Sequence, residues 1–430
     1  MRRVAFWFFL LSACAGWAAN RPEGAVRIVR VDYRLFPGLA KMDGNWSALL
    51  AGSDGRVYVG LAYHGGDGHL VYYDPRGDQM HDVGPLTVLC GEQFLNRGPQ
   101  SKIHTKFGEG KDGRIYFGTQ YGLDFNFARH ATKWGYPGGH WMAYDPSAGR
   151  VMDFGVGIAN EGFVTGKYDS LFNRIYGITD PRGYFVYYDV ASRSVHDKGR
   201  INNWESLCRT LAVDDQGNVY GSFGRGQIFK YDPRTDSIRE LSVRLPIRQK
   251  GISLGRDYNK SETAWRVVVW DKETKKFYGV EESASMLFSF DPHKGDDGEI
   301  HVLGQLCIRG FEDHRDTPYP TLSLTLGNDH KLYYAAAGRE FDYAGSAGLA
   351  ASHLIVYDLQ GGSTEDRGEM RLADDRVVIG TNSADTGPDG TIYFVGATEV
   401  KAADGKPVEA GGRIGNSYYR LALFIYRPNP

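Results

Sequence analysis

A short phrase recurs along this chain of 430 residues and limits what the chain can fold into. Its first half is a strand of the type Gly-Arg-Val-Tyr-Val-Gly, and its second half is a strand that ends in Asp after an aromatic residue. The first half recurs around Tyr58, Tyr116, Tyr176, Tyr220, Tyr278, Tyr333 and Tyr393. The second half closes on Asp74, Asp145, Asp189, Asp232, Asp291 and Asp358. Repeated four-stranded units of this kind are typical of propeller blades, so the sequence predicts an all-β, seven-bladed β-propeller.

The repeated units follow one another closely, which favours one domain over several. They lie at residues 45–85, 101–155, 161–200, 205–242, 263–304, 318–368 and 376–428. The last unit lacks a fourth strand, whereas an unassigned strand, 26–33, lies near the start. We expect this N-terminal strand to pair with the last blade and close the ring, because a sheet edge would otherwise stay open. Residues 20–430 are expected to form this single propeller domain, since each repeat buries its face only against its neighbours.

The first 19 residues have the pattern of an export signal. A positive end at Arg2 and Arg3 precedes an apolar stretch, and the small residues Ala18 and Ala19 follow it. The apolar stretch is too short to serve as a permanent membrane span. Cys14 also fits a bacterial lipoprotein signal, so secretion with cleavage and lipid anchoring through Cys14 both stay open. Either route predicts a protein that works outside the cytoplasm, in the periplasm or beyond the cell.

Charge and cysteine content narrow the range of partners and cofactors. The formal net charge is −2, which does not imply a polyanion-binding surface, so nucleic acid is not an expected partner. Without Cys14, the cysteines are Cys90, Cys208 and Cys307, at no metal-ligand spacing. They are either small buried residues or, for two of them, a disulfide pair. No cofactor is predicted, although a structural or catalytic divalent metal held by residues from several blades stays open, with Asn382 and Asp385 as its first candidates.

Long loops fall on one face of the predicted ring, where the inner strand of each blade begins. His104 lies on the inner strand of the second unit, and Arg209 and Arg266 lie in otherwise apolar inner strands of the fourth and fifth. Because an unpaired buried charge is costly, we expect both arginines to be paired, at the mouth or with a carboxylate such as Glu205. The candidates in the loops and on the last inner strand are His64, Gln120, Tyr121, Arg182, Tyr184 and Asn382. Guanidinium groups, histidines and aromatic rings together favour an acidic poly- or oligosaccharide as ligand.

The segment Ser101-Lys102-Ile103-His104-Thr105, followed by Asp112-Gly113-Arg114-Ile115-Tyr116-Phe117-Gly118, resembles the seven-bladed propeller polysaccharide lyases, especially those that act on ulvan. The resemblance implies β-elimination beside a uronic acid. An Arg neutralises the carboxylate, a His or Tyr takes the C5 proton, and an acid protonates the departing oxygen. It assigns His104 as the catalytic His and Arg182 as the Arg. Gln120 and Tyr121 stand where the family would place a second His, and Tyr184 or Tyr121 would supply the tyrosine.

The sequence therefore favours an exported, monomeric carbohydrate-active enzyme, a polysaccharide lyase on a uronate-containing glycan. Its expected catalytic residues are His104, Arg182 and Tyr184, and its expected substrate contacts are Arg209, Arg266, Gln120, Tyr121, His64 and Asn382. Two other classes stay open: a propeller that binds glycans or proteins without catalysis, and a metal-dependent lactonase or a glycoside hydrolase. For a hydrolase, the carboxylates to consider are Glu109, Glu281 and Asp385.

Overall fold

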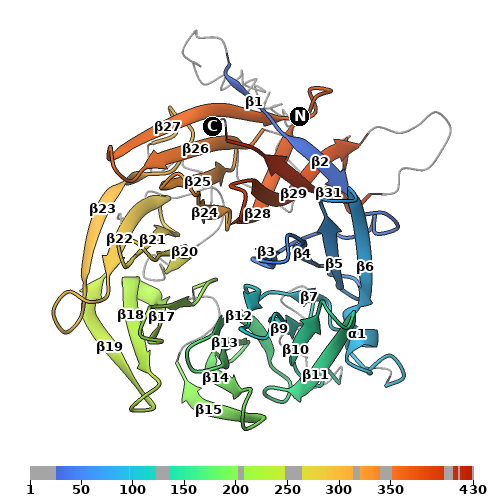
Figure 1. The fold of residues 1–430 in the computed structure, drawn as a ribbon, viewed down its shortest axis with the longest axis vertical. Coiled ribbons are helices and arrows are strands. Elements are labelled where there is room, and N and C mark those ends of the chain that lie inside the picture. The colour runs from blue at the N-terminus through green and yellow to red at the C-terminus, as the bar shows by residue number, and fades with distance from the viewer. Residues whose placement is uncertain are drawn as a thin grey trace, which may run out of the picture.

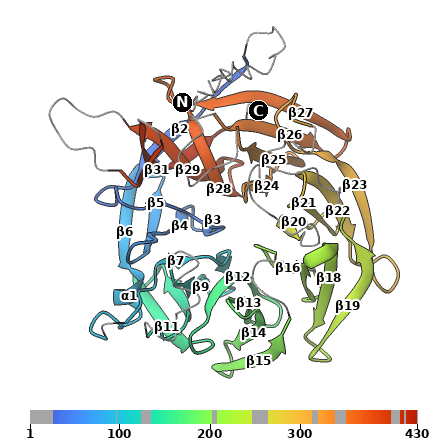
Figure 2. The same cartoon turned by 180° about the vertical axis from the view of Figure 1, so that it is seen from behind.

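Seven antiparallel β-sheets stand around a central axis in the computed structural model of the protein (Figures 1 and 2). The structure describes residues 26–95, 97–122, 135–201, 208–246, 264–312, 320–338, 351–400, 410–414 and 417–428. Each sheet is one blade, and in blades one to six strands A, B, C and D run from the axis outward in chain order, whereas the N-terminal β2 is the outermost strand of blade seven. The prediction of an all-β, seven-bladed propeller is confirmed.

The first four blades each use four consecutive parts of the chain. Blade one holds β3 (Leu49–Ala51), β4 (Val57–Leu61), β5 (His69–Asp74) and β6 (Gln79–Pro85), followed by α1 (Leu86–Leu89). Blade two holds a divided strand A, β7 (Lys102–Ile103) and β8 (Gly108–Glu109), then β9 (Ile115–Gln120), β10 (His140–Asp145) and β11 (Arg150–Val156). Blade three holds β12 (Gly162–Asp169), β13 (Arg174–Asp180), β14 (Tyr184–Asp189) and β15 (Ser194–Arg200). Blade four holds β16 (Ala212–Val213), β17 (Val219–Phe223), β18 (Gln227–Asp232) and β19 (Ser237–Arg244), with the short 3-10 helix η2 (Gly224–Gly226) between β17 and β18.

The last three blades complete the ring. Blade five holds β20 (Trp265–Asp271), β21 (Lys276–Glu281), β22 (Met286–Asp291) and β23 (Glu299–Gln305). Blade six holds β24 (Leu324–Leu326), β25 (Lys331–Ala336), β26 (His353–Asp358) and β27 (Ser363–Arg371). Blade seven holds β28 (Val378–Thr386), β29 (Ile392–Val400) and β31 (Ser417–Tyr426), with β30 (Gly412–Ile414) paired to β31.

The N-terminal segment belongs to two blades rather than one. We expected a single strand over 26–33, but the chain forms β1 (Ile28–Arg30) and β2 (Asp32–Leu35). β1 pairs in parallel with β27 at the outer edge of blade six, and β2 pairs antiparallel with β31 as the outermost strand of blade seven. Val31, which lies between the two strands, is buried, and its amide donates to the carbonyl of Arg371 at 3.0 Å.

The repeated tyrosines of strand B are buried and belong to the scaffold. They are Tyr58, Tyr116, Tyr176, Tyr220, Tyr278, Tyr333 and Tyr393, and each is at most 7 % exposed. In several blades the hydroxyl donates to the carboxylate of the turn before strand B, as from Tyr58 to Asp54 at 2.6 Å and from Tyr116 to Asp112 at 2.8 Å. One residue type thus fills the space between blades and also anchors the turn between strands A and B.

The repeated Asp at the end of strand C closes the next turn. Its carboxylate accepts the backbone amide two residues on, as at Asp74, Asp145, Asp189, Asp232, Asp291 and Asp358. A short acceptor that binds its own backbone in this way favours a tight turn over a longer strand. The turns between strands C and D are therefore alike from blade to blade.

A third repeated device joins the start of strand C to strand D. His69, His140 and His353 open strand C in blades one, two and six, and their Nδ1 atoms lie 3.0, 2.8 and 2.9 Å from Asp82, Asp153 and Asp366 of strand D. The ladder shifts register beside each of these pairs. A glycine with positive φ follows the Asp by two residues, and at Asp153 and Asp366 its amide donates back to the carboxylate. The pair holds the bulge in place.

Cys90, Cys208 and Cys307 form no disulfide with one another. Cys208 and Cys307 are buried and Cys90 is half-buried, so the disulfide alternative is wrong for these three. Cys14 and the expected export signal lie outside the described residues. In the part of the chain that the structure describes, no helix is long and apolar enough to cross a membrane.

Removal of the Tyr-to-Asp hydrogen bond should cause a small loss of stability. Tyr116→Phe should lower the free energy of unfolding by about 1 kcal/mol, because it loses one hydrogen bond and keeps the ring. Tyr116→Ala should cost about 3–5 kcal/mol, because the 1 % exposed ring leaves a cavity. Urea unfolding of the two variants would measure the difference. Equal losses would show that the hydroxyl, not the ring, dominates.

Candidate functional site

Four titratable side chains from the inner strands of blades two, four and five act on one another electrostatically at one end of the central channel. Lys102 begins β7 and His104 follows it, Arg209 precedes β16, and Arg266 lies in β20. Burial holds the pKa of the His104 imidazole well below its ordinary 6.5, and the positive charges of Lys102, Arg209 and Arg266 lower it further. We call this end of the channel the mouth.

His104 is the most confined titratable group of the mouth. Its side chain is 6 % exposed, and its Nδ1 is buried without a hydrogen-bond partner. Because its pKa is so low, the imidazole is neutral at physiological pH and keeps a lone pair available. A buried polar atom without a partner costs stability, so its presence here favours a role in binding or proton transfer.

Blade one covers His104 with an aromatic ring. The indole of Trp46 stacks on the imidazole at a centroid distance of 5.8 Å and an interplanar angle of 1°. The indole also contacts the imidazole of His64 edge-on, at a centroid distance of 6.2 Å. The Nδ1 of His64 lies 2.8 Å from Asp43 Oδ1, and its backbone amide donates to Asp43 Oδ2 at 3.0 Å. His64 and His104 therefore lie on the same wall of the mouth, joined by Trp46.

Blade three supplies a carboxyl group to the same region. The hydroxyl of Tyr121 donates to Asp180 Oδ2 at 2.7 Å, and Gln120 Nε2 donates to the same oxygen at 2.8 Å. Asp180 Oδ1 is buried without a hydrogen-bond partner. Burial raises the pKa of this carboxyl to about 6, although Tyr121, Lys102 and Arg209 all act to lower it. A carboxyl group that titrates so near neutrality can both hold and release a proton.

Lys102 is the cation common to both groups. Burial lowers the pKa of its amine to about 8, and the positive charge of Arg209 adds to this effect. The carboxylates of Asp180 and Asp43 oppose it. Lys102 thus acts electrostatically on His104 on one side and on Asp180 on the other.

Arg266 is paired, as expected for a charged residue in an apolar strand. Its Nη1 lies 3.7 Å from Glu282 Oε1, and its Nε donates to the carbonyl of Pro320 at 3.1 Å. The side chain is 6 % exposed, so the pair is held away from bulk water. Glu205, the other carboxylate considered, lies outside the described residues.

Arg182 contacts a carboxylate other than Asp180, and Tyr184 contacts Arg182. Arg182 pairs through its Nε and its backbone amide with Glu161, which is fully buried, and its side chain is 49 % exposed. Its guanidinium also lies 5.8 Å from the ring of Tyr184. The main observed contacts of Arg182 thus balance a buried charge in blade three, while Asp180, two residues earlier, reaches the mouth.

The remaining candidates have mainly structural contacts. Asn382 accepts the amide of Ser47 through its backbone carbonyl at 3.1 Å. Asp385 accepts the amide of Ala51 at 2.9 Å and pairs with Lys106 at 3.5 Å, deeper in the channel. Glu281 accepts the amides of Ser283, Ala284 and Met286, and Glu109 accepts the amide of Ser53. Within the described residues, Asp385 belongs to no group of three His, Cys, Asp or Glu side chains spaced for a metal ion.

Sequence reasoning missed Lys102, Asp180 and Trp46. Lys102 carried a usable signal, because residues two apart on a strand face the same side, and His104 was already a candidate. Asp180 also carried a usable signal, because it ends strand B of blade three and the candidate Gln120 ends strand B of blade two. Trp46 gave none, because it precedes the first inner strand.

Comparison with known proteins supports the fold alone. No protein-family model and no curated protein matches the chain. A fungal alcohol oxidase of the AA5 family, solved with copper, is 13% identical with a TM-score of 0.56, covering 93% of this chain and 77% of its own. The RRP9 WD40 repeats are 11% identical with a TM-score of 0.55, covering 92% and 98%.

An extracellular domain also shares the fold. It belongs to a B. thetaiotaomicron protein whose name describes a hybrid two component system, and it is 13% identical with a TM-score of 0.51. The match covers 92% of this chain but 39% of that one, so the chain spans about two fifths of this neighbour's length. At such identities the three likenesses show a propeller and nothing of its chemistry.

The raised pKa of Asp180 predicts a pH dependence of stability. An unfolded carboxyl titrates near 3.8 and the folded one near 6, so the folded protein is penalised once the carboxyl ionises. As pH rises from about 4 to about 7, this group should remove roughly 2–3 kcal/mol from the free energy of unfolding. Asp180→Asn keeps an acceptor for Tyr121 and should abolish that part of the slope. Urea unfolding of wild type and Asp180→Asn at about pH 4 and about pH 7 would test this prediction. The same change in unfolding free energy with pH in both proteins would contradict the raised pKa of Asp180.

Proposed function

We propose that the protein is an exported polysaccharide lyase that cleaves a uronate-containing glycan by β-elimination at the mouth of its channel. One observation carries the proposal: a buried, neutral His104 with an unpartnered Nδ1 stands among the positive charges of Lys102, Arg209 and Arg266. A neutral base among cations suits the removal of a proton next to a carboxylate.

The cations would make the proton removable. The C5 hydrogen of a uronic acid is weakly acidic while the neighbouring carboxylate carries its charge. Lys102 and Arg209 at the mouth would neutralise that carboxylate and stabilise the negative charge that spreads onto it when the proton leaves. A guanidinium also aligns a carboxylate through two parallel hydrogen bonds, which would orient the sugar ring.

The proton steps then balance between two groups. The imidazole of His104 would take the C5 proton, the electron pair would form the C4=C5 double bond, and the C4–O bond would break. The departing oxygen would take a proton from the Tyr121–Asp180 pair, since the raised pKa of Asp180 and the raised pKa of the Tyr121 hydroxyl both favour protonated forms. Exchange with water would return a proton from His104 to the pair after release of product.

We keep His104 as the catalytic base that the resemblance implies and assign the binding of the substrate carboxylate to Arg209. Arg266 adds positive charge at the mouth. Arg182 offsets the buried charge of Glu161, so its removal would first disturb blade three. Tyr121 rather than Tyr184 is assigned the acid role, because it contacts Asp180. His64, Gln120 and Asn382 stay predicted as contacts to the sugar chain around the mouth.

The cellular setting fits a polymeric substrate. The export signal predicted over residues 1–19 would place the propeller outside the cytoplasm, where acidic polysaccharides occur. The ring of blades is built within one chain, so we propose a monomer.

Substitution of His104 tests the proposal directly. The purified protein should release products with the ultraviolet absorbance of a conjugated C4=C5 bond from at least one member of a panel of uronate-rich polysaccharides. His104→Ala should lower kcat by at least about 100-fold, because the reaction loses its base. His353→Ala removes a scaffold histidine of blade six and should leave kcat unchanged.

Other outcomes would replace the proposal. Binding to a panel glycan without any elimination would identify a glycan-binding propeller, and new reducing ends without ultraviolet absorbance would identify a hydrolase. Full elimination activity in a folded His104→Ala variant would remove His104 from the mechanism.

A further inference from the structure

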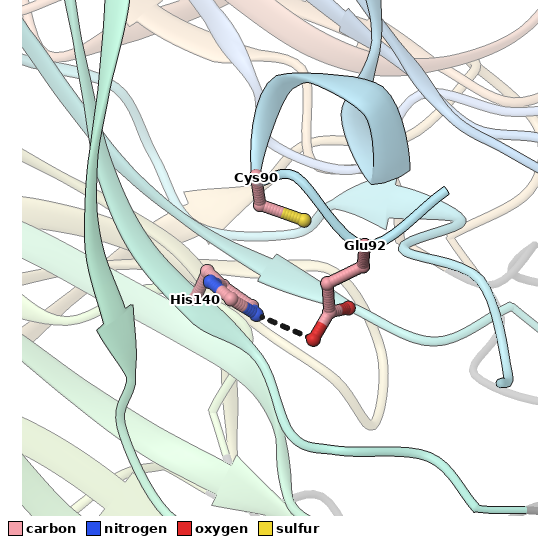
Figure 3. Close-up of side chains that lie close together, drawn as sticks. All are labelled: Cys90, Glu92 and His140. Atoms are coloured by element: carbon pink, nitrogen blue, oxygen red, sulfur yellow. Dashed lines mark ion pairs between the residues drawn. The ribbon is translucent and has the colours of Figure 1, made fainter. Parts of the chain in front are cut away.

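Three side chains with metal-binding atoms meet at the junction of blades one and two (Figure 3). Cys90 directly follows α1, Glu92 lies in the connection to blade two, and His140 is the first residue of β10. The Cys sulfur, a Glu oxygen and a His nitrogen all lie within 4.8 Å of one another. Among the described residues, this is the one group of three or more Cys, His, Asp or Glu side chains with such spacing.

We propose that Cys90, Glu92 and His140 bind a zinc ion that fastens the connection between blades one and two to β10. The inference does not depend on the proposed lyase activity. Thiolate, imidazole and carboxylate are the three ligand types that zinc combines in proteins, and a soft thiolate disfavours magnesium or calcium.

The geometry of the group suits a tetrahedral ion. Glu92 Oε1 and His140 Nε2 are 3.1 Å apart. Two ligand atoms at about 2.0 Å from zinc with a tetrahedral angle between them would be about 3.3 Å apart. His140 Nε2 is buried and faces Glu92 without the alignment of a hydrogen bond, so this nitrogen has no hydrogen-bond partner. The Cys90 sulfur, the third ligand atom, lies within 4.8 Å of both.

A second layer of contacts already orients two of the ligands. Asp153 Oδ1 lies 2.8 Å from His140 Nδ1, which fixes the proton on Nδ1 and turns Nε2 toward the group. Gln100 Nε2 donates to Glu92 Oε2 at 3.1 Å, which leaves Oε1 to face His140. Carboxylate and amide partners of this kind accompany metal ligands generally.

The repeat itself separates scaffold from site. Blades one and six have the same His–Asp pair as blade two, in His69 with Asp82 and His353 with Asp366. In blade two alone, within the described residues, a thiol and a second carboxylate stand at the other ring nitrogen. The His–Asp pair is thus a blade device, whereas Cys90 and Glu92 are additions that complete a ligand set.

The metal-free alternative is a salt bridge. Burial lowers the pKa of His140, but its contacts with Asp153 and Glu92 outweigh this and raise it to about 9. Without a metal, a protonated His140 would bridge the two carboxylates. Cys90 takes no part in that salt bridge. The salt bridge and the zinc site differ in metal content, which can be measured.

The zinc would also support the mouth. Gln100, which contacts Glu92, accepts hydrogen bonds at its Oε1 from Thr119 at 2.8 Å and Tyr136 at 3.0 Å. The chain continues from Gln100 through Ser101 into β7, which carries Lys102 and leads to His104. A metal at this place would hold the base of the segment that presents both residues.

Metal content of the full-length protein tests the inference without any activity assay. Protein purified with zinc and then freed of loosely bound metal should contain about one zinc ion per chain. Cys90→Ser and His140→Ala should each lower the zinc content at least about tenfold, since each removes a ligand. Cys307→Ser and His353→Ala, which remove a cysteine and a scaffold histidine outside this group, should keep the zinc content of wild type. Cobalt in place of zinc should give a thiolate-to-cobalt charge-transfer band in wild type that Cys90→Ser lacks.

Stability gives a second measurement. Removal of zinc by a chelator should lower the melting temperature of wild type and leave that of Cys90→Ser unchanged, because metal bound only to the folded state stabilises it. Wild type with less than about a tenth of a metal ion per chain after zinc loading would overturn the inference. Equal zinc content in wild type and a folded Cys90→Ser variant would also overturn it. Neither result would bear on elimination at His104.

Discussion

The carboxylate that ends strand C in blades one to six is the contact on which the regularity of the ring depends. It binds the amides of its own turn, so each of these blades reverses direction in the same few residues. The buried Tyr of strand B, tied to the preceding turn, sets the spacing to the next blade. With both turns on one face kept short by local hydrogen bonds, added residues accumulate on the other face. The mouth lies on that face for this reason.

The charged side chains of the mouth are largely buried from water. Lys102, Arg266 and Asp180 are each more than half buried, and a protein keeps such groups only when they compensate one another. Burial shifts the two pKa values in opposite directions: with help from the nearby cations it lowers that of His104 and keeps the imidazole neutral, whereas it raises that of Asp180 toward the protonated form. A base and an acid with well-separated tendencies to hold a proton are what elimination chemistry needs.

The fold could be predicted because its determinants are local and repeated. Tyr116, Asp145 and their counterparts each form hydrogen bonds with residues close to them in sequence. Their repetition along the chain therefore predicts the blades and the order of the blades. The site depends on residues brought together from different blades. His104 was found on its own strand, but its contact with Trp46 and the meeting of Lys102 with Asp180 come from the closing of the ring. The pair of Arg182 with Glu161 likewise joins two strands, because Glu161 directly precedes β12 and Arg182 follows β13.

The Cys90, Glu92 and His140 group shows the same limit over a longer span. About fifty residues separate its first and last members, and no spacing rule for zinc sites covers that distance. What reveals it in the structure is comparison between blades, in which a shared His–Asp pair gains two neighbours in one blade only.

The placement of β1 and β2 has a consequence for the order in which the molecule assembles. β2 is made early in synthesis, yet its partner β31 is nearly the last strand, and Asp32 stands opposite Ile425. β2 stays unpaired until β31 is made, and blade seven is complete only when these two strands meet. β1 pairs instead with β27, so one short N-terminal segment joins blade six to blade seven. The ring is therefore closed by contacts between residues far apart in sequence.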